Sequence, residues 1–189
     1  MIFVLGGARS GKSRFAEQTA KELASGSATG RGNTSVLYVA TATACDDEMA
    51  ERIRKHREDR PSDWQTVEEP RDVAGALQRA ELTPNSVVLI DCLTLYVTNH
   101  LLPEGCMEEG ELTWNPEAAE LAVEALLLEI ERSEGTVILV SNEVGLGLVP
   151  DHPLGRVFRD VAGRANQRAA AVAQRVVLLV AGIPVEIKS

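Results

Sequence analysis

The sequence predicts a single domain with an aliphatic core and an α/β fold, in which helices flank a mainly parallel β-sheet. Three observations support these predictions. Short apolar runs typical of buried strands recur along the chain and alternate with helical patterns. The length of 189 residues suits one domain, spanning residues 1–189, with a substantial core. Apolar residues make up 44% of the chain and aromatic residues only 4%, so we expect an aliphatic core.

The first predicted strand, residues 2–5, leads into a match to the P-loop pattern G-x-x-x-x-G-K-S/T. The glycines allow backbone N–H groups to form a nest for phosphate oxygens, and the helix that follows adds its positive dipole end. Lys12 can contact the β- and γ-phosphates, and the Ser13 hydroxyl can ligate Mg²⁺. A chance glycine-rich turn is disfavoured because strand, complete motif and helix occur together. The predicted phosphate-binding residues are Gly6, Gly7, Ala8, Arg9, Ser10, Gly11, Lys12 and Ser13.

A second predicted strand, residues 35–40, precedes a helix that begins with acidic residues near position 46 and ends before Pro61. On this helix His56 lies within a basic run. A neutral imidazole is a competent nucleophile toward phosphorus, and nearby cations would stabilise the charge of the transition state. On spacing alone, a surface histidine in a solvated basic run is the better interpretation. Helical spacing places on one face Met49, Ile53, His56 and Arg60.

The next predicted elements lead to a strand that ends in a carboxylate. An extended piece over residues 64–67 and a helix over residues 71–80 precede a buried strand, residues 86–91, that ends in Asp91. Such a strand resembles the Walker-B pattern, in which the acid lies near Mg²⁺. The pattern is weak alone, but after a complete P-loop we favour this role for Asp91.

The second half of the chain continues the alternation of helices and strands. A helix over residues 93–102 is followed by an acidic loop and by a helix from Pro116 to about residue 133, with Asn115 as its N-cap. Its stripe of Leu121, Ala125 and Leu128 is expected in the core. We then expect a strand over 136–140, a helix over 154–173 and a strand over 175–180. A turn at 182–184 should lead into a short antiparallel edge strand at 185–187.

Composition excludes several classes of function. The net charge of −9 argues against general nucleic-acid binding, and no apolar run has the length of a membrane span. We expect no signal peptide, because the chain enters a strand directly. The three cysteines (Cys45, Cys92 and Cys106) lack metal spacing, so reduced thiols in the cytoplasm are expected. The three histidines are scattered and predict no zinc site.

Five motifs in order show that the chain resembles the bifunctional adenosylcobinamide kinase / adenosylcobinamide-phosphate guanylyltransferase family of cobalamin biosynthesis. The resemblance is weak only at residues 26–33 and 103–116. The motifs are GGARSGKSRFAE; a middle set of YVATA, DDEM, HREDRP and TVEEP; LIDCLTLYVTN; VSNEVGLGLVP; and FRDVAGRANQRAA.

The resemblance implies a RecA-like P-loop NTPase fold, a homotrimer and two reactions with ATP, GTP and Mg²⁺. One reaction phosphorylates adenosylcobinamide, and the other transfers GMP from GTP to adenosylcobinamide phosphate through a guanylyl-histidine at His56. It also implies nucleotide contacts from Thr41, Ala42, Thr43, Arg57, Glu58, Asp59, Arg60, Glu68 and Asp91. Loops around Asn99 and residues 145–150 are candidates for corrinoid docking. Two alternatives remain open: a single-activity P-loop small-molecule kinase and a non-catalytic nucleotide-binding regulatory protein.

Overall fold

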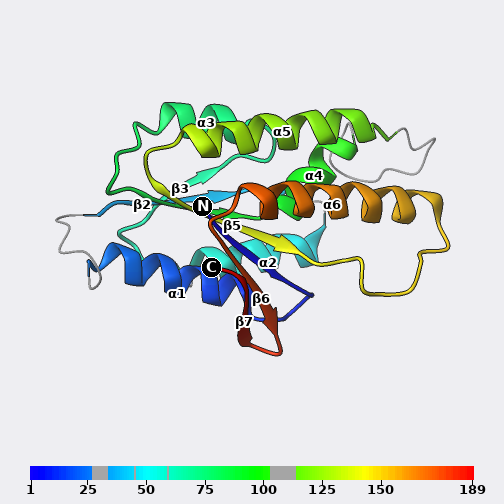
Figure 1. Ribbon diagram of the computed structural model, residues 1–189, viewed down its shortest axis with the longest axis horizontal. Coiled ribbons are helices and arrows are strands. Elements are labelled where there is room, and N and C mark those ends of the chain that lie inside the picture. Colours follow the sequence, from blue (N-terminus) through cyan, green and yellow to red (C-terminus); the bar gives the residue numbers. More distant parts are fainter. Residues whose placement is uncertain (27–33, 45, 59, 103–113) are drawn as a thin grey trace.

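The computed structural model describes residues 1–26, 34–44, 46–58, 60–102 and 114–189, together with their arrangement in space (Figure 1). Within these ranges, three further side chains are not described, those of Arg52, Lys55 and His56. The predictions that fall outside the described residues concern the loops 27–33 and 103–113, Cys45, Cys106 and Asp59.

One seven-stranded sheet with the strand order β3-β2-β4-β5-β1-β6-β7 forms the centre of the fold. Neighbouring strands are parallel throughout, except for the antiparallel pair β6–β7 at one edge. The predicted fold class is therefore confirmed. The strands are β1 (Ile2–Gly6), β2 (Val36–Ala40), β3 (Gln65–Glu68), β4 (Val87–Asp91), β5 (Thr136–Asn142), β6 (Arg175–Val180) and β7 (Ile183–Lys188).

Helices cover both faces of the sheet (Figure 1). Helices α3, α4, α5 and α6 lie on one side, and α1 lies on the other (Figure 1). The alternation of side chains along each strand feeds both layers: Phe3 packs in the cluster under α3–α6, whereas Val4 packs with Ala16 and Ala20 of α1. The helices are α1 (Lys12–Ala24), α2 (Asp47–Glu58), α3 (Val73–Arg79), α4 (Leu93–Leu101), α5 (Pro116–Arg132) and α6 (Pro153–Val172).

The predicted core stripe of α5 is wrong in phase. Leu121 and Leu128 are 59% and 47% exposed. The residues that pack inward are Ala119, Val123, Leu126, Leu127 and Ile130. Both sets follow the helical period, so periodicity alone does not show which set faces the sheet. The N-cap prediction is confirmed, because the Asn115 side chain accepts a hydrogen bond from the backbone N–H of Ala118 at 3.0 Å.

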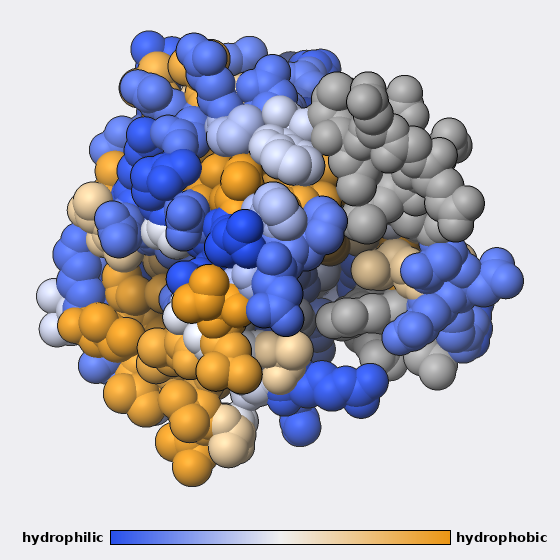
Figure 2. All heavy atoms as spheres, turned by 90° about the vertical axis from the view of Figure 1, so that its right-hand side faces the viewer, coloured by the Kyte–Doolittle hydropathy of each residue, from blue (hydrophilic) through white to orange (hydrophobic). Residues whose placement is uncertain are grey.

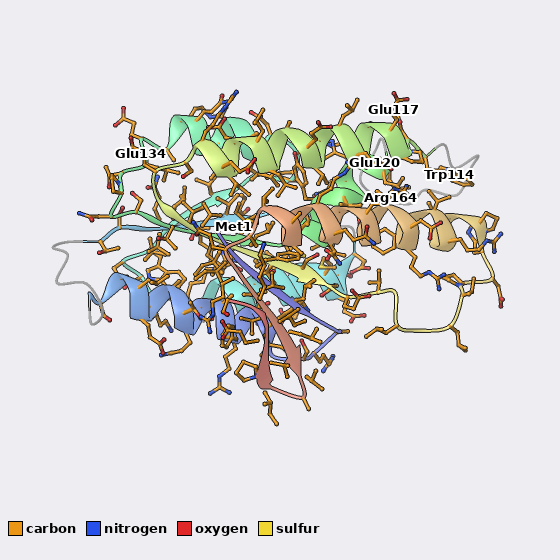
Figure 3. The ribbon with its side chains drawn as sticks, viewed as in Figure 1. Met1, Trp114, Glu117, Glu120, Glu134 and Arg164 are labelled. Atoms are coloured by element: carbon orange, nitrogen blue, oxygen red, sulfur yellow. The ribbon has the colours of Figure 1, made fainter. Side chains whose placement is uncertain are left out.

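Charged side chains also join α5 to α6 at the surface. Arg164 of α6 pairs with Glu120 of α5 at an N–O distance of 2.7 Å (Figure 3). Arg168 of α6 pairs with the same carboxylate at 3.2 Å. Exposed pairs of this kind contribute little to stability, typically about 0–1 kcal/mol each. The apolar cluster shared by α5 and α6 therefore supplies most of the stabilisation between them.

The C-terminal hairpin turns earlier than predicted. The turn consists of Ala181 and Gly182, which both have positive φ (51° and 83°), and β7 starts directly after them at Ile183. Positive φ at both positions fits the tight hairpin turns that match the twist of the strands. The prediction took Pro184 as part of the turn, but a proline without an N–H is tolerated on an edge strand.

Candidate active site

The P-loop segment connects β1 to α1 at the carboxyl edge of the sheet. The loop closes on itself through the N–H of Ser10, which donates to the carbonyl of Gly7 at 3.2 Å, and the carbonyl of Ser10 accepts from Gly182 N–H at 2.9 Å. Gly11 precedes the helix with a φ of 90°, a conformation that favours glycine. The N-terminal N–H groups of α1 therefore lie beside this loop, an arrangement that suits phosphate binding.

Lys12 is held inside this loop. Its side chain is buried, and its Nζ donates to the carbonyl of Gly7 at 3.2 Å. A buried ammonium group is costly unless it is hydrogen-bonded or paired with an anion. The position of Lys12 therefore fits the phosphate-binding role predicted from the motif.

A pocket beside the P-loop brings together residues that are far apart in the sequence. Six of the predicted site residues line it: Lys12, Ser13, Ala42, Arg60, Glu68 and Asp91. Met49 and Ile53 of α2 also line it, as predicted for that helix face, whereas Arg60 lies beyond the end of α2 at Glu58 and not on the helix as predicted. The remaining lining residues were not predicted as site residues; they are Tyr38, Ala40, Cys92, Leu95 and Asn142.

Tyr38 lines this pocket and contacts two predicted site residues, Arg60 and Asp91, but it was not itself predicted as a site residue. Its ring is 1% exposed, and the guanidinium carbon of Arg60 lies 3.7 Å from the ring centroid, a cation–π geometry. Its hydroxyl donates to Asp91 Oδ2 at 3.1 Å. Burial, followed by the negative charge of Asp91, raises the pKa of Tyr38 far above its ordinary value, so the hydroxyl stays protonated. Trp64 packs beside Tyr38, with ring centroids 6.4 Å apart.

Arg60 enters the pocket with unused hydrogen-bonding capacity. Its Nε and Nη1 are buried, and neither has a hydrogen-bond partner among the described residues. Buried guanidinium groups are normally satisfied, and Arg is well suited to phosphate oxygens. An anionic ligand in the pocket would supply the partner that these two nitrogens lack.

Other predicted site residues pair with one another. Arg57 Nε donates to Glu68 Oε1 at 2.6 Å, which links α2 to the end of β3. Arg54 pairs with Glu51 at 2.6 Å and also with Glu58. The basic run of α2 is thus partly neutralised on its exposed surface, and the predicted residue Glu58 is engaged with Arg54.

The predicted site residues that follow β2 differ in burial and in role. The Thr41 hydroxyl donates to the carbonyl of Cys92 at 2.8 Å and accepts from its N–H at 2.7 Å, so this buried side chain joins β2 to β4. Ala42 and Thr43 are more exposed. The prediction of a loop around Asn99 is wrong. Asn99 is buried in α4, where its amide donates to the carbonyls of Thr41 and Pro70 at 2.8 and 2.9 Å.

The donors around the pocket suit Mg²⁺. Ser13 and Asp91 both line it and offer hydroxyl and carboxylate oxygens, the ligands that Mg²⁺ prefers beside nucleotide phosphates. Within the described ranges, no group of three or more His, Cys, Asp or Glu side chains could hold a metal. No helix in the same ranges is long and apolar enough to cross a membrane.

A second hollow lies on the outer side of the P-loop. It is lined by Gly7, Ala8, Arg9 and Ser10, by Glu143 and Leu146, and by residues 178–181. Leu146, which lines this hollow, is one of several strongly exposed apolar side chains in the loop after β5 and on β7. Leu146 and Leu148 are 87% and 97% exposed, and on β7 Ile183 and Ile187 are 66% and 59% exposed. Figure 2 views the molecule from the right-hand side of Figure 1 and shows a broad hydrophobic area on that face.

Comparison with known proteins now adds to this geometry. The family model described as cobinamide kinase / cobinamide phosphate guanyltransferase, CobU, matches residues 2–187. The chain belongs to this family. Membership in the cobinamide kinase / guanyltransferase family agrees with the P-loop fold class predicted from the sequence and with the family named on the five motifs.

Relatives within the cobinamide kinase / guanyltransferase family match over nearly their whole length. The bifunctional adenosylcobalamin biosynthesis protein CobU of Escherichia coli (strain K12) is 45% identical over 192 residues, covering 100% of this chain and 99% of that protein. The protein of the same name from Salmonella typhimurium is 44% identical with the same coverage. CobP of Pseudomonas aeruginosa is 44% identical over 185 residues, which covers 98% of this chain and 95% of that protein.

Proposed function

We propose that the chain catalyses two reactions. It phosphorylates adenosylcobinamide with ATP or GTP, and it transfers GMP from GTP to adenosylcobinamide phosphate. The observation that carries the proposal is the convergence of Lys12, Ser13 and Asp91 on one pocket that Arg60 also lines. The full-length match to bifunctional relatives supports both reactions rather than one.

In the kinase reaction the aminopropanol hydroxyl of adenosylcobinamide attacks the γ-phosphorus. The bond from that phosphorus to the β,γ-bridging oxygen breaks, and the nucleoside diphosphate leaves. The P-loop N–H groups and Lys12 would bind the phosphates and stabilise the charge that develops on them. Ser13 and Asp91 would hold Mg²⁺, which neutralises part of this charge when bound.

In the transferase reaction an imidazole nitrogen of His56 attacks the α-phosphorus of GTP, and pyrophosphate leaves. A phosphate oxygen of adenosylcobinamide phosphate then attacks the same phosphorus, and the P–N bond breaks to return free His56 and adenosylcobinamide-GDP. Met49 and Ile53 line the pocket, and position 56 follows them at helical spacing on the same face of α2. Arg60 would pair with the nucleotide phosphates through the nitrogens that lack a protein partner.

We also propose that the protein acts in the cytoplasm as a homotrimer. Leu146, Leu148, Ile183 and Ile187 are strongly exposed, and Figure 2 shows a broad hydrophobic area on one face, which is typical of an interaction surface. A second copy would cover them. Sedimentation equilibrium of the wild type and of Leu148→Asp tests this, because the substitution should lower the oligomeric state, whereas a monomeric wild type would contradict it.

The experiment that tests the function separates the two reactions with two variants. Purified wild type, Lys12→Ala and His56→Ala are assayed for phosphorylation of adenosylcobinamide and for formation of adenosylcobinamide-GDP. Lys12→Ala should lose most of both activities. His56→Ala should lose GMP transfer and retain much of the kinase reaction. Lys21→Ala, an exposed lysine at the end of α1, is the matched control and should retain both.

Three results would contradict the proposal in different ways. A wild type that only phosphorylates adenosylcobinamide would favour the single-activity kinase. A wild type that binds nucleotide without either reaction would favour a regulatory protein. Equal loss of both activities in a folded His56→Ala variant would argue against a dedicated nucleophile at this position.

A further inference from the structure

Asn142 is a pocket residue that the proposed mechanism does not yet use. It is the last residue of β5, which lies between β1 and β4. In the sheet Asn142 lies beside Gly6, where the P-loop begins, and Asp91 of β4 lies beside Val140. Asn142 therefore extends the carboxyl edge of the sheet between the P-loop and the predicted metal ligand, and it lines the same pocket as Lys12 and Ser13.

The backbone of Asn142 is fixed by a network of buried polar side chains. Its N–H donates to Thr94 Oγ1 at 2.6 Å, and its carbonyl accepts from Asn166 Nδ2 at 3.0 Å. Ser141 Oγ donates to Asn166 Oδ1 at 2.7 Å and lies 3.1 Å from Thr94 Oγ1. Thr94, Ser141 and Asn166 are all below 9% exposed. A connected polar network in an aliphatic core rigidifies the position that it surrounds.

The side chain of Asn142 contrasts with this fully bonded backbone. Its Oδ1 is buried and has no hydrogen-bond partner among the described residues. Buried polar atoms without a partner are rare in folded proteins, and an absent ligand is one of their explanations. The amide carries an acceptor and two donors on one carbon, so it can contact two ligand groups at once.

The surrounding residues indicate which part of a ligand lies there. Lys12 of a P-loop reaches the β- and γ-phosphates, and its Ser with the Walker-B acid holds the metal that bridges them. All three corresponding residues line this pocket. A nucleotide bound by these residues would therefore place its terminal phosphoryl end, rather than its base or ribose, in this part of the pocket.

We propose that Asn142 aligns the two partners of the kinase reaction, an inference that rests on the proposed function. Its amide N–H donates to a γ-phosphoryl oxygen, and its Oδ1 accepts the hydrogen bond of the attacking alcohol. The alcohol oxygen then bonds to the γ-phosphorus, and the bond to the β,γ-bridging oxygen breaks with its electron pair leaving on the diphosphate. The hydroxyl proton passes to solvent. Because the amide is neutral, it does not repel the phosphoryl group as a carboxylate would.

Three measurements on Asn142→Ala and Asn142→Asp test this role. They are kcat of the kinase reaction, the affinity ratio of a non-hydrolysable triphosphate to the diphosphate, and the extent of protein guanylylation by GTP. Loss of a hydrogen bond to a charged group in a closed site corresponds to a change of about tenfold or more in affinity or rate. Asn142→Ala should therefore lower kinase kcat and the affinity ratio by about tenfold each. Guanylylation should change less, because its reacting atom is the α-phosphorus.

Asn142→Asp should lower the affinity ratio further than Asn142→Ala does, because it adds a negative charge beside the terminal phosphoryl group. Asn115→Ala is the matched control. It removes the same side chain from an exposed N-cap outside the pocket, and it should destabilise α5 without changing the affinity ratio. Thermal unfolding of Asn142→Ala should show a Tm no lower than that of Asn115→Ala, since the Oδ1 it removes has no partner in the described fold.

The proposal is overturned if Asn142→Ala keeps the wild-type kinase kcat and affinity ratio. It is also overturned if triphosphate and diphosphate affinities fall equally, which would show a general effect on the pocket. If the wild type has no kinase activity, the proposed function fails. The affinity ratio still tests the contact with the terminal phosphoryl group in that case, so the two failures are distinguishable.

Discussion

Tyr38 gives the sharpest test of the pocket, because its hydroxyl and its ring have separate roles. The hydroxyl donates to Asp91 Oδ2 at 3.1 Å, and the ring lies under the Arg60 guanidinium, 3.7 Å from it. Tyr38→Phe removes only the hydroxyl. Tyr38→Leu removes the hydroxyl and the ring. The first change should act on the metal through Asp91, and the second should act in addition on the nucleotide phosphates through Arg60.

The magnitudes follow from the two contacts. A hydrogen bond to a charged group contributes about 1.5–3 kcal/mol, and about 1.4 kcal/mol is a tenfold change in affinity. We therefore expect Tyr38→Phe to raise by about tenfold the Mg²⁺ concentration needed for half-maximal GTP binding. A cation–π contact contributes about 0.5–2 kcal/mol, so Tyr38→Leu should weaken GTP binding by a further factor of about 2–30. The raised pKa of Tyr38 keeps the hydroxyl protonated, so the Tyr38→Phe effect should not depend on pH near neutrality.

Isothermal titration with GTP over a series of Mg²⁺ concentrations measures both effects. Tyr96→Phe is the control, because its hydroxyl donates to the carbonyl of Ala122 at 3.2 Å and it does not line the pocket. This control should bind GTP and Mg²⁺ like the wild type. The reasoning is refuted if Tyr38→Phe leaves the Mg²⁺ dependence unchanged, or if Tyr38→Leu binds GTP no more weakly than Tyr38→Phe.

Three further predictions concern stability and reactivity. Asn99→Ala leaves two backbone carbonyls without their partner and should lower the unfolding free energy by about 2–4 kcal/mol, or Tm by about 5–15 °C in calorimetry; an unchanged Tm would contradict this. Burial lowers the pKa of His100, so the unfolded chain binds more protons than the folded chain below about pH 6.5, and the unfolding free energy falls as the pH falls. Urea titrations should show a smaller loss of unfolding free energy at low pH in His100→Asn than in the wild type. An equal loss in both proteins would exclude His100 as the cause. Burial raises the pKa of the Cys92 thiol to about 11, so this thiol should react with a thiol reagent only after unfolding. A Cys45→Ala/Cys106→Ala variant leaves Cys92 as the remaining thiol to be measured. Fast reaction of this variant in its native state would contradict the burial of Cys92.

Local patterns in the sequence were sufficient to predict most of the fold. The P-loop, the strand that ends in Asp91 and the strand–helix alternation each depend on residues close together in the chain, so they could be recognised without the structure. The phase of α5 could not, because Leu121 and Ala119 both belong to stripes of helical period and only packing decides between them. The end of the chain was misplaced because Pro184 is typical of a turn but also fits an edge strand.

The predicted site was incomplete for a different reason. Tyr38 lies inside a buried strand, and nothing in its local sequence distinguishes it from a core residue. Its role arises only because β2 lies beside β4, which brings its hydroxyl to Asp91, and because Arg60 folds back over its ring. Asn142 was missed in the same way, since its environment is created by Thr94 and Asn166 from two distant helices. Contacts between distant segments leave little trace in a single sequence.

The most direct test of the whole account is to identify the residue that carries GMP. The wild-type protein is incubated with GTP labelled at the α-phosphate and Mg²⁺, without adenosylcobinamide phosphate, and its peptides are mapped by mass spectrometry. The account predicts an acid-labile, alkali-stable adduct of one GMP on His56, lost in His56→Ala and strongly reduced in Lys12→Ala. A protein that takes up no label, or label on a residue other than His56, would contradict it.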